Sequence, residues 1–257
     1  MVVQAAEGRL IAAAGLRLLV ATAVPVERDA VAKAFAGTPR ELRIPGTVLR
    51  QLPLGHAESP AVIDLAAVGV GPALAAAATS AALTAAALEG TPYDLVVSAG
   101  IAGGFQPEAP VGSLVVADEI TVADLGADTA DGFLPVTELG FGTVTHRPPE
   151  SLVRDLVRAT GARAGAVLTV STVTGTAERA AELRARHPRA LAEAMEGFGV
   201  AEAAAAHGVP VLEIRAVSNP VGPRDRAAWR IGDALAALTE GFGKLAPVLE
   251  SWKEHDL

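Results

Sequence analysis

The chain has 257 residues, no cysteine and a formal net charge of −8 at pH 7. This length fits one large α/β domain or two small ones, and the lack of cysteine excludes a disulfide scaffold, a thiol nucleophile and a cysteine-ligated metal site. The acidic balance, without a cluster of Lys and Arg, argues against binding to nucleic acid through its phosphates. The histidines show no metal-ligand spacing, so we expect no metal site.

An uncharged run at 65–88 is long enough to suggest a membrane span. Gly69, Gly71 and Pro72 divide this run into a strand, a turn and an alanine-rich helix that is too short to cross a bilayer. No basic segment precedes an apolar one at the start of the chain, so we expect no signal peptide. The sequence predicts a cytoplasmic protein with no membrane partner, in which residues 1–15 form an N-terminal extension.

Short apolar runs predict buried strands, and helical spacing of apolar residues predicts helices between them. In the first half of the chain we expect strands at 16–23, 47–54, 61–68, 94–99 and 113–121, with helices at 26–35 and 73–88. In the second half we expect helices at 149–159, 177–186, 190–207 and 226–246, with strands near 166–172 and 209–217. Between the halves, residues 122–148 are rich in Gly, Asp and Thr and predict a long irregular loop.

Strands and helices alternate along the whole chain, which is typical of an α/β fold with helices on both faces of a mostly parallel or mixed sheet. No repeat, linker or low-complexity segment divides the pattern, so residues 16–257 are predicted to form a single domain. In such sheets, ligands bind beyond the carboxyl ends of the strands. The residues that follow each strand are therefore where we expect the chemistry.

Two segments that follow strands in the first half are candidates for this site. Glu27 comes shortly after the first strand, where a carboxylate can also simply stabilise a helix start through the helix dipole. The run Gly-Ile-Ala-Gly-Gly at 100–104 would let a flat or anionic ligand reach backbone N–H groups. The same run can form an ordinary tight turn, and it does not match the GxGxxG pattern of dinucleotide-binding proteins.

A pair of carboxylates stands out on the predicted 190–207 helix. Glu193 and Glu196 are three residues apart, so they should lie near one helix face. Gly197 and Gly199 would each cost a helix interior about 1 kcal/mol, which suggests that another part of the chain packs closely there. A solvated helix face is the alternative, and it fits Glu193 better than Glu196.

The apolar strand near 209–217 delivers Asn219 to the carboxyl edge of the sheet, although Asn is also an ordinary turn residue. Arg215 lies inside this strand, where a buried charge without a partner is costly. We therefore expect Arg215 to pair with Glu27 or Glu196.

In this order, the four segments resemble the purine nucleoside phosphorylase and nucleosidase superfamily, over about residues 16–246. The most specific marks are Met195 with Glu196, and the Arg-Ala-Val-Ser-Asn run that ends at Asn219. This resemblance implies the three-layer fold of that superfamily, with a mixed central sheet and helices on both faces. It also implies an enzyme that acts on a small nucleoside and needs no cofactor.

Two further runs are similar to the futalosine hydrolases of that superfamily. They are Ala-Asp-Leu-Gly-Ala at 123–127 and Ser-Asn-Pro-Val-Gly-Pro-Arg-Asp at 218–225, which is followed by Trp229. The similarity implies hydrolysis of futalosine to hypoxanthine and dehypoxanthine futalosine, on a route to menaquinone. Futalosine carries a benzoate, for which Arg224 and Arg226 are candidates by position, although both also fit a solvated helix start.

The resemblance implies a role for each site residue. Glu27 matches the glutamate that activates water, and Met195 with Glu196 matches the pair that holds the ribose. Asn219 stands where adenine-releasing relatives have an aspartate, and its amide can hydrogen-bond O6 and N7 of a 6-oxopurine but cannot act as an acid. The other substrate-binding residues that we expect are Ile101, Ala102, Gly103, Thr176 and Arg215.

Three alternatives stay open at this point. A phosphorylase acting on inosine or guanosine would need Arg and Ser residues for phosphate, and near the strand ends only Arg28 is a candidate. A methylthioadenosine-type nucleosidase is disfavoured by Asn219. A non-catalytic nucleoside-binding module would not need both Glu27 and Glu196. Relatives form dimers or larger assemblies, so we expect a homo-oligomer whose other partners are the nucleoside and water.

Overall fold

The computed structural model describes residues 15–54 and 61–255. The predicted extension at 1–15 therefore lies, apart from Gly15, outside the described residues. In chain order the elements are β1 (Arg17–Thr22), α1 (Pro25–Ala32), β2 (Arg40–Ile44), β3 (Thr47–Pro53), β4 (Val62–Ala67), α2 (Pro72–Leu88), β5 (Leu95–Gly104), β6 (Leu114–Val122), β7 (Gly126–Thr129), β8 (Gly132–Pro135), β9 (Thr145–His146), α3 (Glu150–Thr160), β10 (Arg163–Thr169), α4 (Ala177–Arg186), β11 (Ala190–Ala194), α5 (Gly197–Ala206), β12 (Val211–Pro220), the short 3-10 helix Arg226–Ala228 and α6 (Ile231–His255).

The central sheet is mixed, and part of it closes on itself. Its strand order is β11-β10-β6-β12-β5-β1-β4-β3-β2, with β9 added beside β6. β5 runs parallel to β1 and β12, whereas β12 and β6 run antiparallel. β11 pairs with β10 on one edge and with β5 on the other, so β5, β12, β6, β10 and β11 form a closed ring. This ring brings the carboxyl ends of β5, β11 and β12 together.

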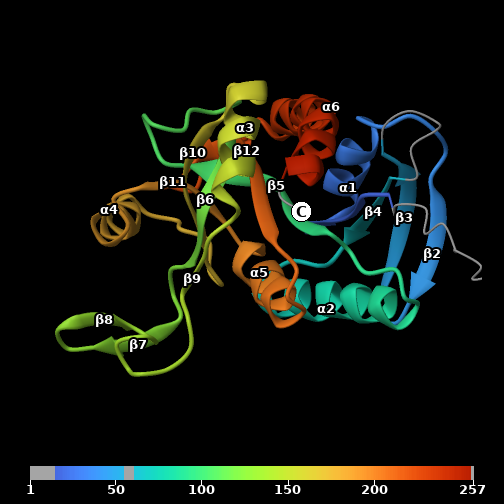
Figure 1. Cartoon of the computed structure of the whole chain (residues 1–257). Coiled ribbons are helices and arrows are strands. Elements are labelled where there is room, and N and C mark those ends of the chain that lie inside the picture. The colour runs from blue at the N-terminus through green and yellow to red at the C-terminus, as the bar shows by residue number, and fades with distance from the viewer. Residues whose placement is uncertain (1–14, 55–60, 256–257) are drawn as a thin grey trace, which may run out of the picture.

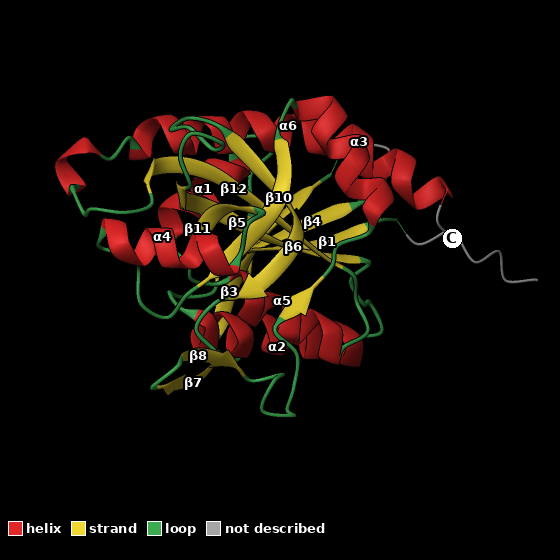
Figure 2. Ribbon diagram, turned by 90° about the vertical axis from the view of Figure 1, so that its left-hand side faces the viewer, coloured by secondary structure: helices red, strands yellow, loops and turns green. Residues whose placement is uncertain are grey.

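Helices cover both faces of the sheet, as Figure 2 shows. α2 and α5 pack on one face around small buried residues such as Ala82 and Ala204. α1, α3 and α6 cover the other face around larger ones such as Leu156 and Phe242. The predicted α/β fold, a mixed sheet between two helical layers, is confirmed. Among the described residues, no helix combines the length and the apolar character that a membrane crossing requires.

The predicted helix at 190–207 is wrong, because its first part is a strand. Residues 190–194 form β11, all five of them buried, and α5 begins only at Gly197. Alanine favours a helix by propensity, but pairing with β10 and β5 on both edges of β11 outweighs that preference. Glu193 and Glu196 therefore do not share a helix face. Glu193 lies in β11, and Glu196 is the N-cap residue of α5.

Other boundaries also differ from the prediction. β5 continues through the small residues to Gly104 instead of ending at 99, since β12 and β11 supply backbone partners on both sides. The expected loop at 122–148 contains the β7–β8 hairpin, which projects from the body of the molecule in Figure 1, and the short strand β9. β2 was not predicted, and α6 runs to His255 rather than ending near 246.

Gly199 marks the closest approach of α5 to α2, and Gly199→Ala is expected to destabilise the fold. A Cβ there would lie 2.1 Å from the carbonyl oxygen of Pro72, so one helix would have to move. We expect a loss of about 1–3 kcal/mol, the usual range for overpacking, measured by urea denaturation. In the control Gly243→Ala, the new Cβ meets nothing within 4 Å, so helix propensity should leave stability unchanged or raise it by up to about 1 kcal/mol. Equal stability of the two variants would contradict this contact.

Candidate active site

A cavity of about 310 Å³ opens where β1, β5, β11 and β12 end. Its wall is mainly apolar, and its polar groups come from elements far apart in the chain. Most of the predicted site residues line it, namely Glu27, Ile101, Ala102, Gly103, Met195, Glu196 and Asn219. The expectation that the strand ends share one site therefore agrees with the geometry.

Glu27 lies at the start of α1, and only 3% of it is exposed. Its Oε2 accepts hydrogen bonds from the backbone N–H groups of Ala23 (3.0 Å) and Val24 (3.2 Å), as expected of a carboxylate at a helix start. Its Oε1 accepts one from the N–H of Ile101 on β5 (2.9 Å). Burial raises the pKa of Glu27 above its ordinary value of 4.5, although the Ile101 N–H and the charge of Arg215 oppose this shift. The Glu27 side chain thus binds backbone N–H groups at the start of α1 and also lines the cavity.

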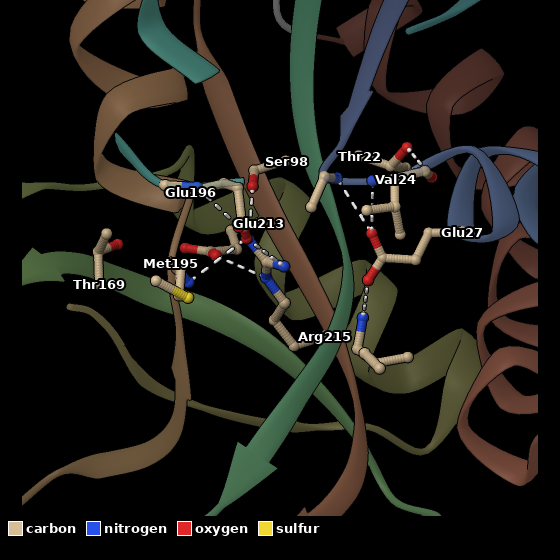
Figure 3. A network of polar contacts seen from close by, with 12 residues as sticks. Thr22, Val24, Glu27, Ser98, Thr169, Met195, Glu196, Glu213 and Arg215 are labelled. Carbon is tan, nitrogen blue, oxygen red and sulfur yellow. Dashed lines mark hydrogen bonds and ion pairs between the residues drawn. The ribbon is translucent and has the colours of Figure 1, made fainter. Parts of the chain in front are cut away.

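Arg215 is the centre of a buried ion network, which Figure 3 shows. Its Nη1 lies 3.2 Å from Glu196 Oε2, and its Nε lies 2.8 Å from Glu213 Oε1. Its Nη2 donates to the hydroxyl of Ser98 at 3.0 Å. The predicted partner Glu196 is confirmed, whereas the second direct partner is Glu213 rather than Glu27. Arg215 itself does not line the cavity but stands behind Glu196.

Glu196 is held from three directions. Its Oε1 accepts from the N–H of Gly71, and its Oε2 accepts from the N–H of Met195, both at 3.3 Å. Arg215 is the third contact. The carboxylate therefore has little freedom to rotate and presents a fixed negative charge to the cavity. Such a preorganised charge can stabilise a cation that forms beside it.

Glu213 was missed by sequence reasoning, and it is fully buried. Burial raises its pKa, and Arg215 opposes the shift. Its Oε2 has no hydrogen-bond partner among the described residues. The available signal was the Glu-Ile-Arg sequence of β12, in which residues 213 and 215 point to the same face of an otherwise apolar strand. Two charges at that spacing in a buried strand indicate an internal ion pair.

Small residues make room for this network. A Cβ on Gly197 would lie 2.2 Å from Glu213 Oε2, and a Cβ on Gly100 would lie 2.7 Å from Glu27 Oε1 and 2.8 Å from Arg215 Nη1. Only glycine fits at either place without displacing a charged group. The close packing that the glycines after Glu196 predicted is therefore present, and at Gly197 it is packing against a carboxylate.

Asn219 lies near the carboxyl end of β12, and two hydrogen bonds hold its amide in one orientation. The hydroxyl of Ser218 donates to its Oδ1 at 2.8 Å, and its Nδ2 donates to the carbonyl oxygen of Pro220 at 2.9 Å. Because an amide nitrogen carries two hydrogens, one N–H remains for a ligand. Asn219 thus offers a donor to the cavity.

Thr176 does not line the cavity. It is the exposed N-cap residue of α4, where its side chain accepts a hydrogen bond from the N–H of Arg179. Thr174, two residues earlier, does line the cavity and is buried. The predicted loop therefore reaches the cavity through Thr174 rather than through Thr176, since the length of a loop does not show which of its residues faces inward.

The rim of the cavity carries a cation beside an aromatic ring. Arg224 and Trp229 both line it, and the Arg224 guanidinium lies 5.2 Å from the centre of the Trp229 ring. Arg226 also lies near this ring, at 5.8 Å, but it is not part of the lining. Arg28 is not part of the lining either, and it pairs with Asp29 at 2.9 Å. The candidate phosphate ligand is therefore engaged elsewhere.

Comparison with known proteins decides the family. One protein-family model, described as the phosphorylase superfamily, matches residues 17–249. A futalosine hydrolase of Streptomyces coelicolor is 76% identical over 241 residues, which cover 94% of this chain and 100% of that relative. This chain belongs to the futalosine hydrolases. A futalosine hydrolase of Acidothermus cellulolyticus is 44% identical over 237 residues, covering 90% of each chain.

Solved structures agree at the level of the fold. The crystal structure of a 5'-methylthioadenosine/S-adenosylhomocysteine nucleosidase from Colwellia psychrerythraea, in complex with adenine, matches with a TM-score of 0.73 at 22% identity. The match covers 92% of this chain and 95% of that one. The futalosine hydrolase family thus shares its three-layer architecture with proteins of distant sequence.

Arg215→Met is expected to lower the free energy of unfolding by about 3–5 kcal/mol at pH 7, because it leaves buried carboxylates without their cation. The loss should shrink as the pH falls. Without Arg215 nothing opposes the effect of burial on Glu213, so the pKa of Glu213 in the folded state rises further above its unfolded value and the folded state binds an extra proton as this group neutralises. Urea denaturation between pH 5 and 8 measures this.

Arg230→Met serves as the control for this variant, since its pair with Asp233 is exposed on both sides (65% and 54%). It should change stability by less than about 1 kcal/mol. A loss in Arg215→Met that is the same at every pH would count against an uncompensated buried charge.

Proposed function

We propose that this chain hydrolyses the N-ribosyl bond of futalosine, releasing hypoxanthine and leaving dehypoxanthine futalosine. The observation that carries the proposal is the 76% identity to a futalosine hydrolase along that relative's whole length. The cavity supports it, because Glu27, Glu196 and Asn219 all line one space from three separate elements. The activity is that of a nucleosidase, an N-glycosyl hydrolase.

Cleavage of this bond places positive charge on the sugar and negative charge on the leaving base. Glu27 is the base that activates water in our proposal, since it is buried, faces the cavity and is held by three backbone N–H groups. Its raised pKa makes it a better proton acceptor than an exposed glutamate. The proton leaves the water for Glu27, the water oxygen bonds to C1' of the ribose, and the bond from C1' to the purine breaks. Its electron pair stays on the purine, which takes up a proton from solvent and leaves as hypoxanthine.

Glu196 accepts hydrogen bonds from the ribose hydroxyls in this proposal, with Met195 packed against the sugar. The charges support this placement. Glu27, Glu196 and Glu213 surround the single cation Arg215, so three ionised carboxylates would exceed it by two negative charges. Glu27 and Glu196 are the two that line the cavity. That field favours a cationic sugar in the transition state over the neutral substrate. Arg215 is a positioning residue that acts through Glu196.

Asn219 and the backbone of Ile101, Ala102 and Gly103 bind the base in this proposal. The free N–H of Asn219 suits O6 or N7 of a 6-oxopurine, and a hydrogen bond there stabilises the charge that develops on the leaving group. Asn219 cannot protonate the base, so leaving-group activation depends on this hydrogen bond. Arg224 is the cation nearest the rim for the benzoate of the substrate.

We also propose that the reaction belongs to a route to menaquinone in the cytoplasm, and that the chain forms a homo-oligomer. The route rests on the similarity to futalosine hydrolases, the location on the absence of a predicted signal peptide, and the oligomer on the resemblance to the superfamily. Val70 at the cavity rim and Leu74 at the start of α2 are 51% and 60% exposed, which would suit coverage by a second copy.

The substrate assignment predicts which base is released and under which conditions. Purified protein should release hypoxanthine from futalosine at a rate that does not change when phosphate is added. Inosine and methylthioadenosine, offered in parallel, should be cleaved far more slowly. Base release that requires phosphate would identify a phosphorylase, and adenine release from methylthioadenosine as the main activity would place the chain with the other nucleosidases.

Glu27→Gln is expected to lower kcat by about 10²–10⁴, the usual contribution of a general base, while circular dichroism stays unchanged. In the unaltered protein, kcat/KM should fall as the pH decreases through the raised pKa of Glu27, because only the ionised carboxylate accepts a proton. The midpoint should therefore lie above the ordinary 4.5.

Glu41→Gln is the control for this variant, since Glu41 is 53% exposed on β2. It should keep full activity. Full activity of Glu27→Gln would remove Glu27 from the role of base.

A further inference from the structure

Glu193 and Asn219 lie on either side of Gly103 in one row across the closed ring. Gly103 on β5 is paired with Glu193 on β11, and it is also paired with Asn219 on β12. Neighbouring strands are about 4.8 Å apart, so the two outer Cα atoms are separated by at most about 10 Å. Directly paired residues point to the same face of a sheet, and all three line the cavity.

Gly103, in the middle of this row, has no side chain. A Cβ there would lie 2.9 Å from Val221 Cγ2 and 3.4 Å from Asn219 Nδ2. Val221 and Asn219 therefore already fill the space next to Gly103, and a larger residue there would displace them. A ligand can lie between the two polar side chains only in the cavity that Glu193, Gly103 and Asn219 all line.

The two polar side chains offer opposite hydrogen-bonding characters. Asn219 presents a donor, because its Nδ2 keeps one N–H after the other donates to the carbonyl oxygen of Pro220. Glu193 is 5% exposed, and its two oxygens accept from the N–H and the hydroxyl of Thr174. Burial raises the pKa of Glu193, but both Thr174 donors favour its ionised form. An ionised carboxylate only accepts hydrogen bonds, and each oxygen keeps a free lone pair.

No salt bridge reaches Glu193 within the part of the chain that the structure describes. A buried carboxylate on a cavity wall that is held by two hydroxyl or amide donors, and not by a cation, can accept a further donor from a ligand. The Glu193 carboxylate takes part in none of the hydrolysis steps proposed above.

We propose that Glu193 is a specificity-determining residue that accepts a hydrogen bond from N1–H of a 6-oxopurine while Asn219 donates to the O6 and N7 side. The inference rests on the proposed function, since it places the base in the cavity between Glu193 and Asn219. A 6-oxopurine carries a donor at N1 and acceptors at O6 and N7. A 6-aminopurine has an acceptor at N1 and a donor at its amino group. Its N1 would face the Glu193 carboxylate, which is also an acceptor, and its amino group would face the Asn219 N–H, which is also a donor. Neither pair can form a hydrogen bond.

A simpler role for Glu193 would be to anchor the loop that carries Thr174, and two variants separate the roles. Glu193→Gln keeps an oxygen that can accept from Thr174 but replaces the other oxygen with a donor that suits N1 of a 6-aminopurine. Thr174→Val removes the hydroxyl contact to Glu193 and leaves the carboxylate in place. A loop anchor predicts similar losses in both variants and for both kinds of base.

The test measures kcat/KM for futalosine and for its 6-amino analogue in the unaltered protein and in both variants. Glu193→Gln should lower kcat/KM for futalosine by about 10- to 100-fold, as for loss of a hydrogen bond to a charged group. It should shift the ratio of the two substrates at least tenfold toward the 6-amino analogue. Thr174→Val should leave that ratio unchanged. An unchanged ratio in Glu193→Gln would overturn the proposal.

Binding of free bases keeps this test separate from the hydrolase assignment. By calorimetry, Glu193→Gln should weaken hypoxanthine and strengthen adenine relative to the unaltered protein, whether or not futalosine is cleaved. Should Glu193→Gln fail to fold, Glu193→Ala removes the same acceptor, and it must lower the preference for hypoxanthine at least tenfold. If the variant and the unaltered protein prefer hypoxanthine over adenine equally, the role of Glu193 is overturned. If this preference changes but the unaltered protein does not cleave futalosine, only the substrate assignment is overturned.

Discussion

The structure depends on one buried cation. Arg215 lies in the middle of β12 and contacts Glu196 and Glu213 directly, with the charge of Glu27 acting from farther away. Burial lowers the pKa of Arg215, but these carboxylates outweigh it, so the guanidinium stays charged. Without this cation, negative groups from α1, the start of α5 and β12 would repel one another where the protein shields them from most of the solvent. The cation therefore links elements that the sequence holds far apart.

Close packing is the second constraint, and it follows from the first. Charged groups can meet in the interior only if nothing bulky stands between them, and this explains Gly100 and Gly197. The same lack of side chains lets β5 run straight through its small residues and pair with both β12 and β11. The ring closes there, and its closure sets the floor of the cavity.

Much of this was predictable from the sequence, and the failures have physical causes. The buried strands, the two helical layers and the cavity at the strand ends followed from periodicity. Motif resemblance, added to their positions after strands, predicted that Glu27, Met195, Glu196 and Asn219 would lie together, and all four line the cavity. β11 was not found, because its alanines suit a helix and only pairing on both edges makes it a strand.

Contacts between distant segments could not be read from local patterns. Glu213 looked like one charge in an apolar strand until its partner and the glycine facing it were known. The choice of Thr174 over Thr176 depends on which way a loop turns into the cavity. Pairing of Glu193 with Gly103 joins residues 90 positions apart, and no local rule predicts such a register.

Ring closure has a consequence for how the site comes into being. The residues that line the cavity extend from Ala23 to Trp229, so nearly the whole chain must reach its native order before any of them can act together. Contacts of such long range carry a large loop-closure entropy and form late in folding. A nascent chain would therefore have no partial activity while it emerges from the ribosome. The site is complete only when β12 and the segment up to Trp229 have joined the ring that the pairing of β11 with β5 closes.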